Sequence, residues 1–160
     1  MSTHEMRAVF DMDEVLLRSP ADGDLEPPLG FPYRLMFQER IYIGVPALFY
    51  FLEKEGYDVW VYSSKYRSVD DVRRFFRFYS AQITGAVTGI GQHGINTKKL
   101  KDLFAGNYKS TLHIDNENIL CTKRGQKDFT EIPLQKGAAM WSREIMDIVK
   151  GMHANEENNR

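Results

Sequence analysis

Short apolar runs separated by polar segments organise the chain. Runs rich in apolar and β-branched residues are typical of buried strands. They cover residues 7–10, 57–62, 82–89, 110–115 and 129–133. Elsewhere, apolar side chains recur every three or four residues, which predicts amphipathic helices over 46–56, 70–79, 97–104 and 140–152. Strands that alternate with helices predict an α/β fold whose central sheet is mostly parallel.

Turn-forming residues separate these elements. The stretch from Ser19 to Gly30 is rich in Pro, Gly and Asp, which predicts a loop. The stretch from Pro32 to Gly44 has two apolar segments around a Gln-Glu pair, which predicts a small hairpin. Since no linker divides the chain, we expect a single domain over residues 1–150 and a disordered polar tail over 151–160.

Composition and charge narrow the functional classes. Apolar residues make up 42% and charged residues 27%, as in an ordinary globular domain. The net charge of −1 gives no overall attraction to nucleic acid, and no apolar run is long enough to span a membrane. The first residues lack a secretory pattern, and the one cysteine, Cys121, is expected to be a structural thiol in a loop. We therefore expect a cytoplasmic protein that binds neither nucleic acid nor a membrane.

Acidic and hydroxyl side chains directly follow three of the predicted strands. Asp11 and Asp13 follow the first strand. Ser63 and Ser64 follow the second, and Asp115 ends the fourth. Because ligands gather at the carboxyl ends of parallel strands, we expect these side chains to converge on one edge of the sheet. Crowded carboxylates are costly to bury, and Mg²⁺ together with a phosphate ester would offset that cost.

The order of these motifs resembles that of the haloacid dehalogenase-like hydrolases, most of which are phosphatases. Their first motif, Asp-x-Asp-x-Thr/Val after a strand, is matched by "DMDEV" from Asp11. Ser63 in "VWVYS" matches the second motif, and Asp115 in "LHIDN" matches the fourth. A lysine in "NTKKLKDL" matches the third. The resemblance implies a three-layer Rossmannoid fold with a mostly parallel sheet and a small hairpin flap, and the short segments between motifs leave no room for a large cap domain.

Within that superfamily, the chain is loosely similar to the small phosphatases that act on the carboxyl-terminal repeat of RNA polymerase. Those proteins also carry Asp-Asn in the fourth motif, as Asp115 and Asn116 do here. The later "IPL" and the terminal helix with Trp141 are similar as well. Asn116 is neutral where many other relatives carry a second acid, a change that can lower metal affinity.

The resemblance also implies roles. Asp11 would be the nucleophile that forms an aspartyl phosphate. Asp13 would protonate the leaving oxygen and then activate water, which requires a pKa above the usual value of about 3.9. Mg²⁺ would be held by Asp11, by the backbone carbonyl of Asp13 and by Asp115. Ser63 and the backbone N–H of Ser64 would hold phosphate oxygens.

The catalytic lysine is the least defined of these positions. Lys99 has the expected spacing before the fourth motif, and Lys98 and Lys101 are alternatives. Arg34 and Arg40 lie on the predicted hairpin, either as extra charge near an anionic substrate or as ordinary solvated residues.

The sequence therefore predicts a magnesium-dependent phosphatase with an open site for a phosphorylated small molecule or a phosphoprotein. The alternative is a non-catalytic module of the same fold that binds phosphate or protein partners. A phosphoacceptor receiver domain is disfavoured, because the strand after the acidic pair ends in Ser63 rather than in an acceptor Asp. Of the histidines, His113 is expected to pack in the core and His93 to lie in a loop.

Overall fold

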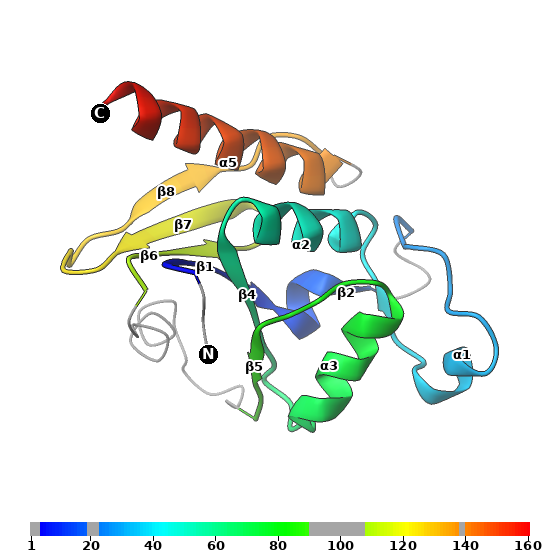
Figure 1. The fold of residues 1–160 in the computed structure, drawn as a ribbon. Helices are drawn as coiled ribbons and strands as arrows, with labels where there is room; N and C mark the ends of the chain where they lie inside the picture. The colour runs from blue at the N-terminus through cyan, green and yellow to red at the C-terminus, as the bar shows by residue number, and fades with distance from the viewer. Residues whose placement is uncertain (1–3, 19–22, 90–107, 138–139) are drawn as a thin grey trace.

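A computed structural model describes residues 4–18, 23–89, 108–137 and 140–160 (Figure 1). These residues form an α/β fold around a six-stranded sheet with strand order β5-β4-β1-β6-β7-β8. The strands are β1 (Met6–Asp11), β4 (Tyr57–Tyr62), β5 (Gly85–Val87), β6 (Ser110–Ile114), β7 (Asn118–Lys123) and β8 (Thr130–Pro133). The first four in that spatial order run parallel, and β7 and β8 form an antiparallel extension. The predicted mostly parallel sheet is therefore confirmed.

The strand β7 was not predicted from the sequence. It pairs with β6 so that Cys121 lies opposite Leu112, which corrects the expectation that Cys121 lies in a loop. The thiol is half-buried there, and this burial raises its pKa. Only one side chain of β7, Ile119, is fully buried, and its apolar residues span just Ile119 to Cys121 between polar neighbours, so the strand has a weak local signal.

The helices that the structure describes lie mainly where the sequence predicts them. They are the π-helical turn η1 (Met12–Leu16), α1 (Tyr33–Met36), α2 (Val45–Lys54), α3 (Val69–Phe78) and α5 (Trp141–Asn158). Ser68 caps α3, with its side chain accepting from the backbone N–H of Asp71. The expected disordered tail over 151–160 is wrong, because α5 continues without a break to Asn158. The predicted helix over 97–104 lies outside the described residues.

The predicted hairpin over residues 32–44 is also wrong. Its first half forms α1, whose Tyr33 ring packs 4.2 Å from that of Phe78 in α3. Its second half forms β3 (Arg40–Ile41), which pairs antiparallel with β2 (Leu17–Arg18) from before the loop. We call this two-stranded unit the flap. Tyr33 and Phe37 of the segment pack on rings of α3, whereas Tyr42 packs on Trp141 of α5, and these long-range contacts are not visible in the local pattern.

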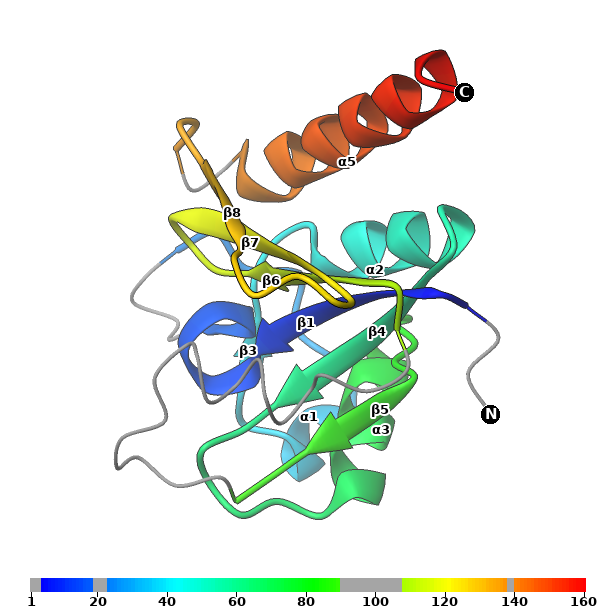
Figure 2. The ribbon, with the colours of Figure 1, turned by 90° about the vertical axis from the view of Figure 1, so that its left-hand side faces the viewer.

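The helices α2, α3 and α5 pack on one face of the sheet (Figures 1 and 2). Ala8 and Phe10 of β1 point to this face, and Phe10 contacts the rings of Phe49 in α2 and Trp141 in α5. The opposite face carries alternate residues such as Arg7 and Thr111, which are hydrogen-bonded to each other. Among the described residues the fold therefore has two layers, and the third layer that the sequence predicted is not shown. None of the described helices combines the length and the hydrophobicity needed to cross a membrane.

Gly44 joins the flap to α2 at a position where other residues do not fit. Its φ is +86°, in the left-handed region, and a Cβ atom there would collide with the Ser142 side chain of α5. We expect Gly44→Ala to lower the free energy of unfolding by about 2–4 kcal/mol in urea denaturation. Gly30→Ala is the control, because a Cβ at Gly30 meets nothing within 4 Å. Equal stabilities of the two variants would contradict this expectation.

Candidate active site

The candidate site lies at the carboxyl ends of three neighbouring parallel strands, β4, β1 and β6 (Figure 2). Asp11 is the last residue of β1 and pairs with Tyr62, the residue before Ser63. On the other side of β1, Phe10 pairs with Ile114, the residue before Asp115. Because neighbouring strands are about 4.8 Å apart, Asp11, Ser63 and Asp115 lie on the same edge of the sheet. The convergence that the sequence predicted for these three positions is present.

Asp11 caps η1 with its side chain. Its Oδ1 accepts hydrogen bonds from the backbone N–H groups of Asp13 at 3.0 Å and Glu14 at 3.2 Å. Burial raises the pKa of Asp11 to about 6, and the nearby charge of Asp13 adds to this effect against the two hydrogen bonds. Tyr62 lies within the electrostatic reach of both Asp11 and Asp115, whose charges add to burial in raising the pKa of its phenol. A cation bound beside Asp11 would favour its carboxylate form.

Asp13 has the opposite electrostatic character from the one predicted. Burial alone would raise its pKa, but hydrogen bonds from Ser63 and Arg67 outweigh burial, so its pKa lies below the usual value. Arg67 Nη2 lies 2.9 Å from Asp13 Oδ1 in an ion pair that is mostly shielded from solvent. The expectation of a raised pKa is wrong for this arrangement, because these donors favour the carboxylate.

The groups predicted to hold phosphate surround one oxygen of Asp13. Ser63 Oγ donates to Asp13 Oδ2 at 2.7 Å, and the Ser64 N–H donates to the same oxygen at 3.0 Å. Ser64 Oγ reaches it at 3.3 Å. The predicted phosphate-binding groups are therefore together in space and converge on an anionic oxygen. In this structure that oxygen belongs to the protein's own carboxylate.

Two residues of the site were missed in the sequence. Arg67 binds Asp13, and it also makes a bidentate contact with Glu39, through Nη1 at 2.8 Å and Nη2 at 2.7 Å. Glu39 precedes β3 of the flap, so this contact joins the flap to the strand ends. An arginine four residues after Ser63 in "SSKYRS" was the available signal. Nothing local indicates Glu39.

A second group of contacts links Asp115 to η1. Asp115 Oδ1 accepts from the backbone N–H of Asn116 at 2.7 Å, and its carbonyl accepts from Trp141 Nε1 at 3.0 Å. Asn116 accepts from Arg18 at 2.7 Å and donates to the carbonyl of Glu14 at 3.2 Å. The amide of Asn116 therefore links the end of β6 to η1 and β2, a task that requires a donor and an acceptor on one side chain.

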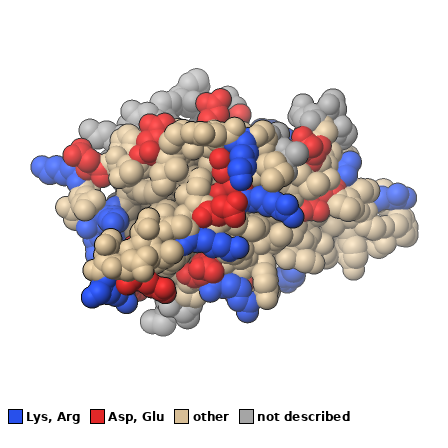
Figure 3. All heavy atoms as spheres, turned by 90° about the horizontal axis from the view of Figure 1, so that it is seen from above, with Lys and Arg blue, Asp and Glu red and all other residues tan. Residues whose placement is uncertain are grey.

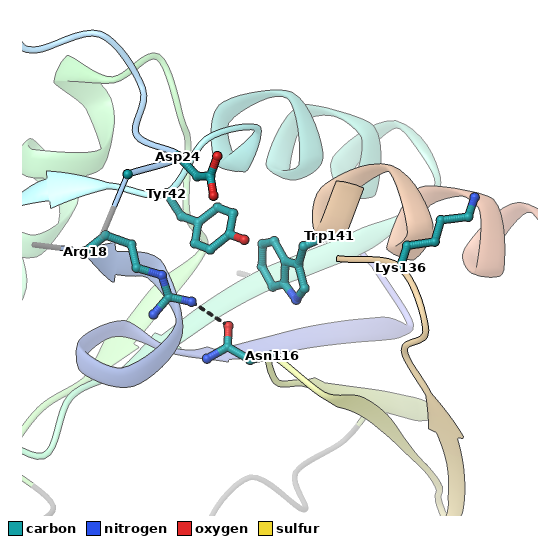
Figure 4. A pocket seen from close by; sticks show the side chains of 7 residues that line it. Arg18, Asp24, Tyr42, Asn116, Lys136 and Trp141 are labelled. Atoms are coloured by element: carbon teal, nitrogen blue, oxygen red, sulfur yellow. Dashed lines mark hydrogen bonds between the residues drawn. The ribbon is translucent and has the colours of Figure 1, made fainter. Parts of the chain in front are cut away.

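A small cavity opens beside this bridge. Its volume is about 190 Å³. It is lined by Arg18, Gly23, Asp24, Tyr42, Asn116, Lys136 and Trp141. Figure 4 shows the Arg18 guanidinium directed at Asn116, next to the rings of Tyr42 and Trp141. The guanidinium carbon also lies 4.6 Å from the centre of the Tyr42 ring, so the Arg18 charge is held by the protein itself.

The lysines, histidines and arginines singled out in the sequence differ in where the structure places them. Lys98, Lys99 and Lys101 lie outside the described residues, as does His93. His113 is buried in β6, as predicted. Arg40 donates to the backbone carbonyl of Glu26 at 2.7 Å, and Arg34 is exposed on α1.

The predicted metal ligands fit Mg²⁺ only in part. Within the described ranges, no group of three or more His, Cys, Asp or Glu side chains could hold a metal ion. Asp13 does not complete such a group, since its carboxylate is turned toward Ser63 and Arg67. Asp11 and Asp115 remain as two carboxylates on the same edge of the sheet. Of the two carboxylate oxygens of Asp11, only Oδ1 accepts hydrogen bonds from the described residues. Mg²⁺ is commonly held by one or two carboxylates with water and substrate phosphate, so these residues suit that mode.

Comparisons with protein-family models, with curated proteins and with solved structures find no match for this chain. The chemistry of the site therefore follows from its own residues alone.

The distribution of charged side chains on the surface is a separate feature of the protein. On the face seen from above in Figure 3, acidic and basic side chains are interspersed. The described side chains of that face form no broad basic patch of the kind that binds nucleic acid.

Proposed function

We propose that this protein is a magnesium-dependent phosphatase of the haloacid dehalogenase type, which hydrolyses phosphomonoesters through an aspartyl phosphate. The observation that carries the proposal is the shared position of Asp11, Ser63 and Asp115 at the ends of three adjacent parallel strands. The described chain between β1 and β4 contains only η1, the flap, α1 and α2, apart from loops. This small insertion supports an open site that takes a phosphorylated small molecule or a phosphoprotein.

In the proposed reaction, a carboxylate oxygen of Asp11 attacks phosphorus while the bond from phosphorus to the leaving oxygen breaks. Asp13 gives its proton to that leaving oxygen. Asp13 then takes a proton from water, whose oxygen attacks phosphorus and releases phosphate from Asp11. Two displacements with a positioned acid and base replace one difficult hydrolysis.

The surroundings of Asp13 set a condition on this reaction. Its hydrogen bonds to Ser63 and Arg67 favour the ionised carboxylate, whereas a general acid has to carry a proton. These donors therefore have to turn from Asp13 to the substrate before the first step. A phosphoryl group with several anionic oxygens is a strong competitor for them.

Mg²⁺ would be held by Asp11, by the backbone carbonyl of Asp13 and by Asp115, and when bound it reduces the repulsion between the anionic nucleophile and the phosphoryl oxygens. Lys99, or Lys98 or Lys101 in its place, would add positive charge to the same oxygens. Asn116 would position the site rather than react, since its side chain links the end of β6, beside Asp115, to the η1 turn that follows Asp11.

A non-catalytic module that binds phosphate or a protein partner is the second candidate. The ion pair between Asp13 and Arg67 favours it, because an ionised Asp13 cannot act as an acid. The two candidates differ in turnover. A binding module would bind inorganic phosphate without hydrolysing any ester, whatever metal is supplied.

Hydrolysis of p-nitrophenyl phosphate with and without metal tests the proposed activity. We expect release of p-nitrophenol in MgCl₂, less than about 1% of that rate after treatment with EDTA, and recovery when excess Mg²⁺ is restored. Ca²⁺ at the same concentration is the control, since its larger size and more flexible coordination suit the site less well. Equal rates with EDTA and with Mg²⁺ would contradict the metal dependence, and no turnover with any metal would favour the binding module.

A further inference from the structure

We propose that Arg67 is a substrate-binding residue of this site, which binds the phosphoryl oxygens together with Ser63 and Ser64. The inference deepens the proposed function and rests on it. The resemblance to haloacid dehalogenase-like hydrolases implies only the hydroxyl, the backbone N–H and a lysine as phosphate ligands. The structure adds a guanidinium to the same group of donors.

The first observation is the convergence of these donors. Ser63 Oγ, Ser64 N–H, Ser64 Oγ and Arg67 Nη2 all point at the carboxylate of Asp13, at distances of 2.7–3.3 Å. Arg67 Nε also lies 3.2 Å from Ser63 Oγ. A phosphoryl oxygen that binds Ser63 and Ser64 is therefore within reach of the guanidinium. A planar guanidinium suits phosphate because it offers two parallel donors.

The second observation is that the backbone of this segment is held in place by the end of β5. Ser63 N–H donates to the carbonyl of Val87 at 2.9 Å. Thr88 Oγ1 donates to the carbonyl of Arg67 at 2.7 Å, and the N–H of Gly89 donates to the carbonyl of Lys65 at 2.9 Å. The loop from Ser63 to Arg67 is thus fixed at both ends. Donors held in this way lose little freedom when an anion binds.

Glu39 accounts for the position of the guanidinium. It accepts two hydrogen bonds from Arg67, and its side chain is 41% exposed, so water weakens the attraction. Arg67 is only 19% exposed and remains charged between its two carboxylate partners. An incoming phosphoryl group has to replace only the Asp13 contact, while Glu39 keeps the guanidinium oriented. Glu39 is therefore a positioning residue.

A purely structural role for Arg67 would be to tie the flap to the loop after β4. That role predicts equal damage from removing either partner of the Glu39–Arg67 ion pair. Phosphate binding predicts unequal damage, because only Arg67 would contact phosphate. The matched variants Arg67→Met and Glu39→Gln separate these roles, as both break the same ion pair.

The experiment measures binding of inorganic phosphate by calorimetry in MgCl₂, and hydrolysis of p-nitrophenyl phosphate by the same proteins. We expect Arg67→Met to weaken phosphate binding at least about tenfold and to lower kcat/KM about a hundredfold. Glu39→Gln should weaken phosphate binding by about two- to threefold at most, a smaller loss than in Arg67→Met, because the amide oxygen of Gln can still accept from Arg67 and water already weakens this ion pair. Arg67→Lys should recover part of the affinity, because it restores the charge without the planar pair of donors. The thermal midpoint of each variant shows whether it folds. If Arg67→Met does not fold, the loss of phosphate affinity is measured in Arg67→Lys instead.

The outcomes separate this inference from the proposed function. If the wild type hydrolyses the ester and Arg67→Met binds phosphate as tightly, the inference is wrong and the phosphatase proposal stands. Equal losses in Arg67→Met and Glu39→Gln would show a structural role and also overturn the inference. If phosphate binding depends on Arg67 but no ester is hydrolysed, the inference stands and the binding module replaces the enzyme. A wild type that neither binds phosphate nor hydrolyses the ester overturns both.

Discussion

Asp11→Asn is expected to reduce the hydrolysis of p-nitrophenyl phosphate by at least about a thousandfold, because the amide cannot attack phosphorus. The amide oxygen of Asn can still accept the hydrogen bonds that Asp11 Oδ1 receives from Asp13 and Glu14. The cap of η1 is therefore retained in this variant. The measurement is the rate of p-nitrophenol release in MgCl₂ for wild type and variant at equal protein concentration.

Stability provides a second readout for the same variant. Because burial raises the pKa of Asp11 to about 6, the folded protein holds a proton there that the unfolded chain has lost by that pH. The Asp11 carboxylate thus destabilises the metal-free fold as the pH rises from about 4 through about 6. In metal-free buffer at pH 7, Asp11→Asn should therefore unfold at a temperature no lower than the wild type. Loss of activity can then be assigned to chemistry rather than to unfolding.

Glu14→Gln is the matched control, since it removes one negative charge from an exposed side chain three residues away. Its activity should stay within about threefold of the wild type, because Glu14 contributes to the site through its backbone. More than a tenth of wild-type activity in Asp11→Asn would rule out this residue as the nucleophile. The binding module would then account better for the site.

Phe10→Ala is expected to lower the free energy of unfolding by about 3–5 kcal/mol, the range observed when a buried aromatic ring is removed. Phe10 is 0% exposed, and its ring centre lies 5.0 Å from that of Phe49 and 6.3 Å from that of Trp141. The cavity would lie between β1, α2 and α5. Small domains have a total stability of only about 5–15 kcal/mol, so the loss is a large fraction of it.

Urea denaturation measures this effect. The slope of the unfolding free energy against urea concentration should be unchanged, which checks that unfolding remains two-state. Phe31→Ala is the control, because that ring is 72% exposed and its removal should change the stability by less than about 0.5 kcal/mol. If the two variants lost equal stability, Phe10 would not have the central packing role assigned to it. Since Phe10 directly precedes Asp11, its loss should also reduce any activity of the site.

The network around Asp13 connects the two proposals. In the structure, the donors that would bind phosphate are occupied by the protein's own carboxylate. Binding of a phosphoryl group and release of Asp13 are therefore parts of one exchange. The Arg67 variants report on phosphate binding and the Asp11 variant on the covalent step, so the two sets of experiments test different stages.

The amino-acid sequence by itself determined the parallel strands of the sheet, the approximate positions of α2, α3 and α5, and the approximate place of the site. The strands β1, β4 and β6 are rich in apolar, aromatic and β-branched residues, most of which are buried, and this composition is a local signal. The acidic and hydroxyl residues follow those runs directly, and the parallel arrangement brings Asp11, Ser63 and Asp115 to one edge.

Only the tertiary structure decided which partners surround those residues. Arg67 is 54 residues from Asp13 and 28 residues from Glu39 along the chain, so the packing of the flap and the loop after β4 creates their contacts. These contacts reverse the pKa shift expected for Asp13. The pairing of β2 with β3 also depends on a long-range contact, since Leu17 pairs with Ile41. Local periodicity reports burial along one segment, whereas ion pairs and pKa values depend on which segments meet in space.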